Sequence, residues 1–193
     1  MKRRNLLKYG LEAGAVTLLG VGLVESDVLA GSERPPIYPP GAPAESEYLQ
    51  RCIKCGRCIQ ACPVDALGFS GLSSGVRRSG TSTLVPEAAG CITWDRECLA
   101  CIEACPVDAL EPVPTDEKGI PTDEVIGRAQ IDDTRCINCG NCYPICPVDA
   151  VIPEGENDRP TYSIDHEACV GCGRCIEICP VEDKAVELFP PDS

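Results

Sequence analysis

The chain repeats one short pattern of cysteine, aliphatic and turn-forming residues four times. Three copies have the spacing C-x2-C-x2-C-x3-C-P, as at residues 136–147. Pro-Val-Asp-Ala opens the segment after three of the copies, and alternating polar and apolar residues precede the third and fourth copies, at 129–132 and 162–165. Alternation predicts short strands, because successive side chains of a strand point to opposite faces. The pattern therefore predicts repeated units of cysteine loop, proline turn and short strand.

Residues 1–30 have the layout of an export signal. A basic segment, Lys2 to Lys8, precedes the apolar stretch 13–24, which is too short to span a bilayer comfortably. Small residues at Val28 and Ala30 suit signal-peptidase cleavage. The pair Arg3-Arg4 resembles a twin-arginine signal, whose pathway exports folded proteins with their cofactors inserted. The alternatives are an uncleaved anchor, or a basic start followed by a buried helix.

The remaining chain divides into an arm and a cassette region. Residues 31–50 combine a Pro-rich, extended arm with a short entry helix expected over 45–50. The four-cassette region takes up 51–193. Within that region the Gly- and Ser-rich segment 68–83 is expected to be an exposed loop, and 116–124 a second excursion.

Composition limits both the core and the partners. Aromatic residues make up only 4% of the chain, while it holds 16 cysteines, 18 glycines and 18 prolines. A chain with so little bulk needs metals or disulfides to stabilise it. The net charge of −13 argues against nucleic acid as a partner and favours docking to a basic patch on a partner protein.

The cysteine spacing is that of two-cluster [4Fe–4S] ferredoxins, in which three closely spaced cysteines bind one cube and the fourth binds a second cube. All 16 cysteines fall in the four cassettes, so four [4Fe–4S] clusters are predicted. The fold class expected is α+β, with tandem ferredoxin-like modules of short strands, short helices and long loops. The predicted ligands are Cys52, Cys55, Cys58, Cys62, Cys91, Cys98, Cys101, Cys105, Cys136, Cys139, Cys142, Cys146, Cys169, Cys172, Cys175 and Cys179.

Disulfides and zinc are the competing interpretations of these cysteines. An exported chain with an even cysteine count suits disulfides, but cysteines at every third position would have to pair in strained loops. Zinc needs sets of four ligands and does not account for the x2-x2-x3-P spacing. In the second cassette the gap from Cys91 to Cys98 is wider, and Leu99 stands where the others have glycine. That site is expected to hold a cluster, and a weakly held or three-iron form is the alternative.

Small and aliphatic residues lie beside the cysteines. Glycines 56, 140 and 173 let the backbone approach a cluster closely, because they lack a Cβ atom. Aliphatic side chains at equivalent positions are expected to seal the clusters from solvent. These are Ile53, Ile59, Ile92, Ile102, Ile137, Ile145, Val170 and Ile176.

The chain resembles the MauM/NapG family of ferredoxin-type proteins. The resemblance rests on Arg3-Arg4, 39–42, 47–49, 52–58 and 80–86. It implies four [4Fe–4S] clusters, twin-arginine export to the periplasm and electron transfer. The electrons would pass from a membrane quinol-oxidising partner to a periplasmic reductase or dehydrogenase, with any membrane association made through the partner.

Two arrangements of the cassettes are open. The short spacer 147–168 favours adjacent pairing, with the first cassette beside the second and the third beside the fourth. Resemblance to the four-cluster subunits of molybdenum oxidoreductases favours nested pairing, with the first beside the fourth. We expect the nested arrangement.

Electron transfer is the predicted function, with the chain as a non-catalytic subunit of an oxidoreductase complex. His166 is the only histidine, and no catalytic triad or nucleotide-binding motif is present in the sequence. One alternative is a catalytic oxidoreductase subunit with an open iron at the second cassette. Another is an assembly factor that holds clusters only as structure.

Overall fold

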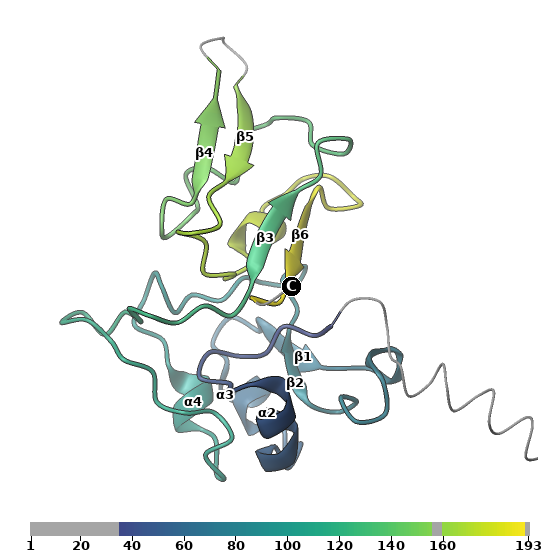
Figure 1. Cartoon of the computed structure of the whole chain (residues 1–193), viewed down its shortest axis with the longest axis vertical. Coiled ribbons are helices and arrows are strands. Elements are labelled where there is room, and N and C mark those ends of the chain that lie inside the picture. The colour runs from purple at the N-terminus through teal and green to yellow at the C-terminus, as the bar shows by residue number, and fades with distance from the viewer. Residues whose placement is uncertain (1–34, 156–159, 192–193) are drawn as a thin grey trace, which may run out of the picture.

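The computed structural model describes residues 35–155 and 160–191, and these form two lobes (Figure 1). The predicted export signal at 1–30 lies outside the described residues. The lower lobe in Figure 1 contains α2 (Glu45–Arg51), α3 (Arg57–Ala61), β1 (Leu67–Phe69), the 3₁₀ helix η1 (Leu72–Ser74), β2 (Ser82–Leu84) and α4 (Ala100–Glu103). The upper lobe contains β3 (Arg128–Ile131), β4 (Val151–Glu154), β5 (Thr161–Ile164), α5 (Arg174–Glu177) and β6 (Val186–Phe189).

Three two-stranded antiparallel sheets organise the described residues, and none has more than four residues in a strand. β1 pairs with β2, and β4 pairs with β5. β3 pairs with β6, so that Arg128 lies opposite Phe189 and Ile131 opposite Val186. This third pair closes the upper lobe, because it joins the strand before the third cassette to the strand after the fourth.

The predicted strands are present at five of the six expected places. β3 and β5 precede the third and fourth cassettes, and β1, β4 and β6 follow the first, third and fourth. The prediction of a strand after the second cassette is wrong. There the backbone N–H of Glu111 donates to the carbonyl of Gly41 at 2.6 Å, and only an isolated bridge forms further on, between Thr115 and Pro121. The N-terminal arm therefore occupies the position that a strand partner would need.

The segment 68–83 is less exposed than expected. Its ends form β1 and β2, and Ser70, Thr81 and Ser82 are buried. Burial of these hydroxyls is tolerated because they are paired. Ser70 Oγ lies 3.0 Å from Thr81 Oγ1, and the Tyr48 hydroxyl lies 2.7 Å from Ser82 Oγ. Exposed residues alternate with these buried ones, and they include Leu72, 71% accessible at the tip, and Phe69, 59% accessible in β1.

The predicted entry helix is confirmed as α2, which begins after Ala44 and ends at Arg51. Glu45 and Glu47 lie in its first turn and Arg51 in its last, a distribution that complements the helix dipole. Tyr48 is the buried residue of this helix and packs against the ring of Tyr38 in the arm. The arm is therefore part of the lower lobe rather than a free linker.

The two lobes are joined by direct backbone and side-chain contacts. The N–H of Cys91 donates to the carbonyl of Cys172 at 2.7 Å. The N–H of Gly90 donates to a carboxylate oxygen of Glu177 at 2.9 Å. Arg174 forms an ion pair with Asp95 at 2.8 Å. Because Cys172 also packs into the core of the lower lobe, the second and fourth cassettes meet at this joint.

Candidate iron–sulfur centres

The first trio of cysteines shares a small, mostly apolar cavity with a cysteine of the second cassette. Cys52, Cys55 and Cys58 line this cavity together with Cys105. The loop that carries the trio leads directly into α3, and Cys105 lies just beyond α4, which contacts α3. Four cysteines thus line one cavity, although they come from two segments of the chain.

The altered second cassette also takes part in a site with four cysteines. Cys91, Cys98 and Cys101 line one cavity with Cys62. The longer segment between Cys91 and Cys98 folds toward the protein interior. Thr93 is fully buried, donates its hydroxyl to the carbonyl of Cys98 at 2.7 Å and lies 3.1 Å from the Cys91 sulfur. The wider spacing is therefore accommodated by a buried turn and does not displace a cysteine from the site.

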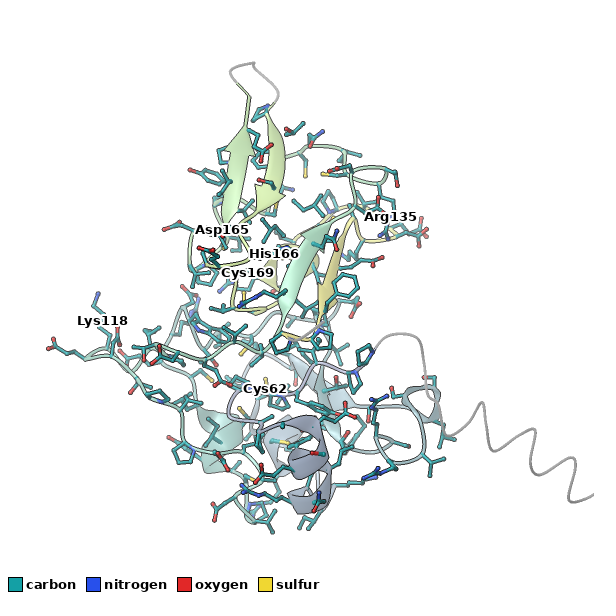
Figure 2. All side chains as sticks on the ribbon, in the orientation of Figure 1. Cys62, Lys118, Arg135, Asp165, His166 and Cys169 are labelled. Atoms are coloured by element: carbon teal, nitrogen blue, oxygen red, sulfur yellow. The ribbon has the colours of Figure 1, made fainter. Side chains whose placement is uncertain are left out.

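The upper lobe repeats this arrangement. The third trio, Cys136, Cys139 and Cys142, lines a cavity with Cys179. In the fourth site Cys169 and Cys175 pack in one core with Cys146, and Cys146 interacts electrostatically with Cys172. Figure 2 shows Cys62 in the lower lobe and Cys169 in the upper lobe, close to Asp165 and His166.

The nested pairing expected from resemblance is wrong, because the cassettes pair with their neighbours in sequence. Each completing cysteine comes from the adjacent cassette of the same lobe. Three backbone hydrogen bonds fix this choice. The N–H groups of Val85, Asp165 and Asp132 donate to the carbonyls of Ala66, Ala150 and Ala185 at 2.7–2.8 Å. Each bond ties the segment before one cassette to the turn after its partner.

The Pro-Val-Asp-Ala turns carry hydrogen bonds to sulfur that the cysteine spacing does not predict. The backbone N–H groups of Ala66, Ala109 and Ala150 donate to the sulfurs of the cysteines four residues earlier, each at 3.3 Å. The preceding aspartates, 65, 108 and 149, adopt the left-handed conformation, with φ of 56°, 49° and 53°. Aspartate tolerates this conformation better than most residues. The repeated tetrapeptide was the sequence signal for these N–H···S bonds.

The glycines of the terminal loops have a stricter role than expected. Gly56 and Gly140 have φ of 70° and 76°, the left-handed region that favours glycine. A Cβ at Gly56 would lie 2.6 Å from the Phe69 ring, and one at Gly140 would lie 2.5 Å from the Tyr162 hydroxyl. These glycines therefore admit an aromatic ring from a nearby strand.

The predicted aliphatic lining is only partly right. Ile176 is buried, as expected, at 2% exposure. Ile53 and Ile137, however, are 60% and 65% exposed. Both follow the first cysteine of a terminal loop, which has solvent on its outer side. Both nevertheless line the cavities of the first and third sites, so they cover these sites while remaining exposed themselves.

The buried sulfurs have raised pKa values. Burial raises the pKa of Cys101 and of Cys172 to about 12, and nearby cysteines add to the effect. Burial also raises the pKa of Cys175. A buried thiolate is unfavourable without a compensating positive charge. These sites therefore favour a cationic iron core that can stabilise several thiolates together.

The arrangement of the cysteines bears on the disulfide and zinc alternatives. All 16 cysteines are free of disulfides. Sulfurs around one zinc ion lie about 3.8 Å apart, as tetrahedral Zn–S bonds require. Among residues 35–155 and 160–191, no three His, Cys, Asp or Glu side chains gather closely enough to hold one metal ion. Four sulfurs spread around an apolar cavity suit a polynuclear cluster.

The four candidate sites form a row through the molecule. The first and second sites are neighbours, because each takes cysteines from the segments of α3 and α4, which contact each other. The N–H of Cys91 in the second site donates to the carbonyl of Cys172 in the fourth, and Cys175 of the fourth also lines the cavity of the third. The order is therefore first, second, fourth, third. The inner sites hold the buried cysteines, 101, 169 and 172, whereas the outer sites hold the exposed ones, 55 and 139.

Known proteins match this chain over most of the cassette region. A model described as a 4Fe-4S dicluster domain matches residues 129–188, and a second such model matches 51–109 and 91–150. The methylamine utilization ferredoxin-type protein MauM of Methylorubrum extorquens is 30% identical over 152 residues, which cover 76% of this chain and 67% of that protein. The chain belongs to the MauM/NapG family of ferredoxin-type proteins. It is an iron–sulfur protein with [4Fe–4S] clusters as its cofactors.

Other MauM/NapG proteins are longer than this chain. The ferredoxin-type protein NapG of Escherichia coli is 30% identical over 153 residues, which cover 76% of this chain and 63% of NapG. The chain therefore spans less than two thirds of that relative. A formate dehydrogenase–heterodisulfide reductase–formylmethanofuran dehydrogenase complex from Methanospirillum hungatei aligns over 86% of this chain and 53% of its own, at 19% identity and a TM-score of 0.28. That similarity is too low to define a fold.

Two further features bear on the site. His166 is exposed on the turn before Cys169, and its neighbour Asp165 accepts a backbone hydrogen bond from Glu167 at 2.8 Å (Figure 2). This aspartate orders the turn that leads into the fourth cassette. Within the described ranges, no helix has the length and apolar character needed to cross a membrane.

Proposed function

We propose that this chain is a periplasmic electron-transfer protein that relays single electrons through four [4Fe–4S] clusters bound by its 16 cysteines. The observation that carries the proposal is the row of four sulfur-lined sites with buried sites in the middle and exposed cysteines at both ends. A bound [4Fe–4S] cluster supplies reversible one-electron chemistry. The row offers a path along the molecule from one exposed end to the other.

The protein's own groups hold, insulate and tune the clusters. The cysteines of two neighbouring cassettes supply four sulfurs to each site. The N–H groups of Ala66, Ala109 and Ala150 donate to coordinating sulfurs and favour the more negative, reduced state. Burial of Cys101 and Cys172 excludes water from the inner sites. These roles require no substrate-binding group.

The proposed partners are a membrane quinol-oxidising protein as donor and a periplasmic reductase or dehydrogenase as acceptor. The family resemblance and the Arg3-Arg4 pair support this assignment. Twin-arginine export carries folded proteins, which suits a protein whose clusters are inserted in the cytoplasm. Membrane association would then occur through the donor.

The catalytic alternative is less well supported. It needs an iron with a vacant position at the second cassette. Cys62 joins Cys91, Cys98 and Cys101 around that cavity, so four thiols are available there. A fully ligated cluster offers no position for substrate, which favours electron transfer.

Anaerobic iron and sulfide analysis of the purified protein tests the number of clusters. We expect about 16 iron atoms and about 16 sulfides per chain, as four cubes require. A value of about four irons would rule out a relay. Turnover of a small substrate without any partner protein would instead support the catalytic alternative.

Export is tested separately. Replacement of both Arg3 and Arg4 by lysine keeps the positive charge but removes the paired guanidinium groups. We expect the variant to accumulate in the cytoplasm with its clusters in place. Normal appearance of this variant in the periplasm would refute the twin-arginine assignment.

A further inference from the structure

The two ends of the row of sites carry closely matched loops that differ in charge. The first-site loop is Cys-Ile-Lys-Cys-Gly-Arg-Cys, at 52–58, and the third-site loop is Cys-Ile-Asn-Cys-Gly-Asn-Cys, at 136–142. Both contain an exposed middle cysteine, an exposed isoleucine and a left-handed glycine. The differences are therefore confined to two positions, where the first loop has cations and the third has neutral amides.

The cations of the first-site end face solvent and have no acidic partner among the described residues. Lys54, Arg57 and Arg77 are exposed, and none of them forms an ion pair with another described residue. The ammonium group of Lys54 donates to the carbonyls of Arg77 and Ser79 at 3.1 and 2.6 Å, which holds the Arg77 loop beside the first-site loop. Asp108 is the acidic residue on the turn that completes this cavity. Positive charge therefore dominates this rim.

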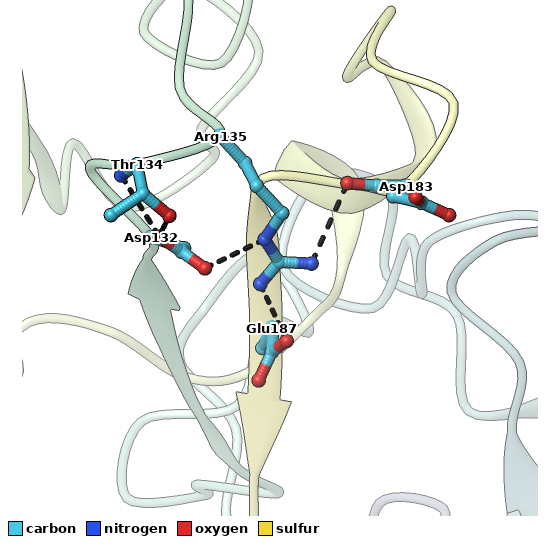
Figure 3. A network of polar contacts seen from close by, with 5 residues as sticks. All are labelled: Asp132, Thr134, Arg135, Asp183 and Glu187. Carbon is cyan, nitrogen blue, oxygen red and sulfur yellow. Dashed lines mark hydrogen bonds and ion pairs between the residues drawn. The ribbon is translucent and has the colours of Figure 1, made fainter.

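The third-site end has the opposite balance. Val181 and Ala185 line its cavity, and the turn between them carries the exposed Glu182 and Asp183. Lys184 lies on the same turn and donates its ammonium group to the carbonyls of Glu177 and Cys179. Figure 3 shows Arg135 held between Asp132, the Asp183 carbonyl and Glu187, so that one cation meets two carboxylates. Hydrogen bonds from Thr134 and Arg135 lower the pKa of Asp132 to about 2 and keep it charged.

Apolar side chains stand beside the charges at the first-site end. Ile53 is 60% exposed and Phe69, whose ring lies over Gly56, is 59% exposed. Exposed apolar residues ringed by charge mark protein interaction sites. Cys55, in the same loop as Ile53, is also exposed. A partner bound here would therefore approach a coordinating sulfur directly.

We propose that the first-site end, formed by Ile53, Lys54, Arg57, Phe69 and Arg77, is the docking surface for a redox protein with an acidic face. This assignment rests on the proposed electron relay. It adds that the two ends of the row favour partners of different charge. A chain of net charge −13 would otherwise repel an acidic partner. The local cations reverse that preference at one end of the row, so that donor and acceptor are sorted by charge.

Small redox probes of opposite charge test the proposal without a known partner. Reduced protein is mixed anaerobically with ferric EDTA, an anion, or with hexaammineruthenium(III), a cation. In each case one electron leaves a reduced cluster and the metal of the probe is reduced by one unit. The second-order rate constant of cluster oxidation is followed by stopped-flow absorbance at low ionic strength.

The matched loops supply reciprocal variants. In the double variant Lys54→Asn/Arg57→Asn we expect the rate constant for the anionic probe to fall by about threefold or more, because local charge steers such encounters. The rate constant for the cationic probe should not fall. In the reverse variant, Asn138→Lys/Asn141→Arg, the rate constant for the anionic probe should rise. Lys118→Asn, on the protruding loop in Figure 2, removes a remote positive charge and is the control for Lys54→Asn.

The outcomes separate the two proposals. If both probes oxidise the protein but the single variants Lys54→Asn and Lys118→Asn slow the anionic probe equally, the docking proposal fails and the relay stands. If neither probe oxidises the reduced protein, the relay itself fails. If a variant loses iron, the wild-type protein still tests the docking proposal. Its rate constant with ferric EDTA should fall as salt is added, and a rise would overturn the docking proposal.

Discussion

At the residue scale, three aspartates position backbone N–H groups that donate hydrogen bonds to cysteine sulfurs. Asp65, Asp108 and Asp149 each adopt a left-handed conformation that turns the next N–H toward a cysteine sulfur. Such a conformation costs most L-residues about 1–2 kcal/mol. The aspartate side chains are exposed, so the backbone conformation is the main reason for their presence.

Asp149→Val tests this interpretation. A β-branched side chain is strained at positive φ, so we expect the variant to lose about 1–2 kcal/mol of stability. Asp149→Gly, which adopts the same conformation freely, should remain close to wild type. Thermal unfolding of the cluster-loaded proteins measures the difference. Equal destabilisation by both variants would show that the carboxylate itself is what matters.

Arg174 is the residue placed to tune the inner sites. Its side chain is largely buried, it pairs with Asp95, and it lies against Gly90 between the second and fourth cassettes. A positive charge stabilises the more negative, reduced form of a nearby cluster. Arg174→Gln should therefore lower the midpoint potential of an inner cluster, whereas Arg174→Lys should largely preserve it.

Potentiometric titration followed by EPR measures this shift. Arg96→Gln is the matched control, because Arg96 also lies beside Asp95 but is 72% exposed. Equal effects of Arg96→Gln and Arg174→Gln on the potentials would contradict a specific role for the buried guanidinium.

At the scale of elements, the sequence predicts the parts of the fold better than their assembly. The cassettes, α2 and the strands β3 and β5 follow from local spacing and alternation, which depend on neighbouring residues alone. The pairing of cassettes depends on which turn meets which strand end. That choice is made by contacts such as Asp132 N–H to the Ala185 carbonyl, between residues far apart in sequence. Spacer length was the better guide, since it favoured the adjacent pairing.

Double substitutions test the adjacent pairing. Cys62→Ala and Cys91→Ala remove ligands of the same proposed site, so the double variant should lack no more than one cluster, or about four irons. Cys62→Ala and Cys175→Ala affect different sites and should together cost about eight. In nested pairing Cys62 would complete the fourth site. The Cys62→Ala/Cys91→Ala variant would then lose about eight irons, and the Cys62→Ala/Cys175→Ala variant about four. Iron analysis of the folded variants distinguishes the two arrangements.

At the scale of the whole molecule, the clusters and the fold are interdependent. The sheets are two-stranded, and the hydrophobic cores contain cysteines and the apolar residues packed around them. Two-stranded sheets are at best marginally stable alone. Anaerobic removal of iron by a chelator should therefore unfold both lobes. Circular dichroism measures this, and a native spectrum after complete removal would contradict it.

The joint between the lobes decides whether the row of sites works as one path. Cys91 and Cys172 meet there through a 2.7 Å backbone hydrogen bond, and each belongs to an inner site. Sequence alone gives no sign of this contact, because it joins cassettes from different lobes. The joint turns two ferredoxin-like modules into a single row with two exposed ends.

EPR spectroscopy of the fully reduced protein tests the relay most directly. Four reduced clusters in one row should give a signal that integrates to about four spins per chain, with the broadening caused by magnetic coupling between neighbouring clusters. Partial reduction should sharpen the spectrum as neighbours become diamagnetic. A fully reduced protein with about one spin per chain, or with sharp signals free of coupling, would contradict a continuous row of four clusters.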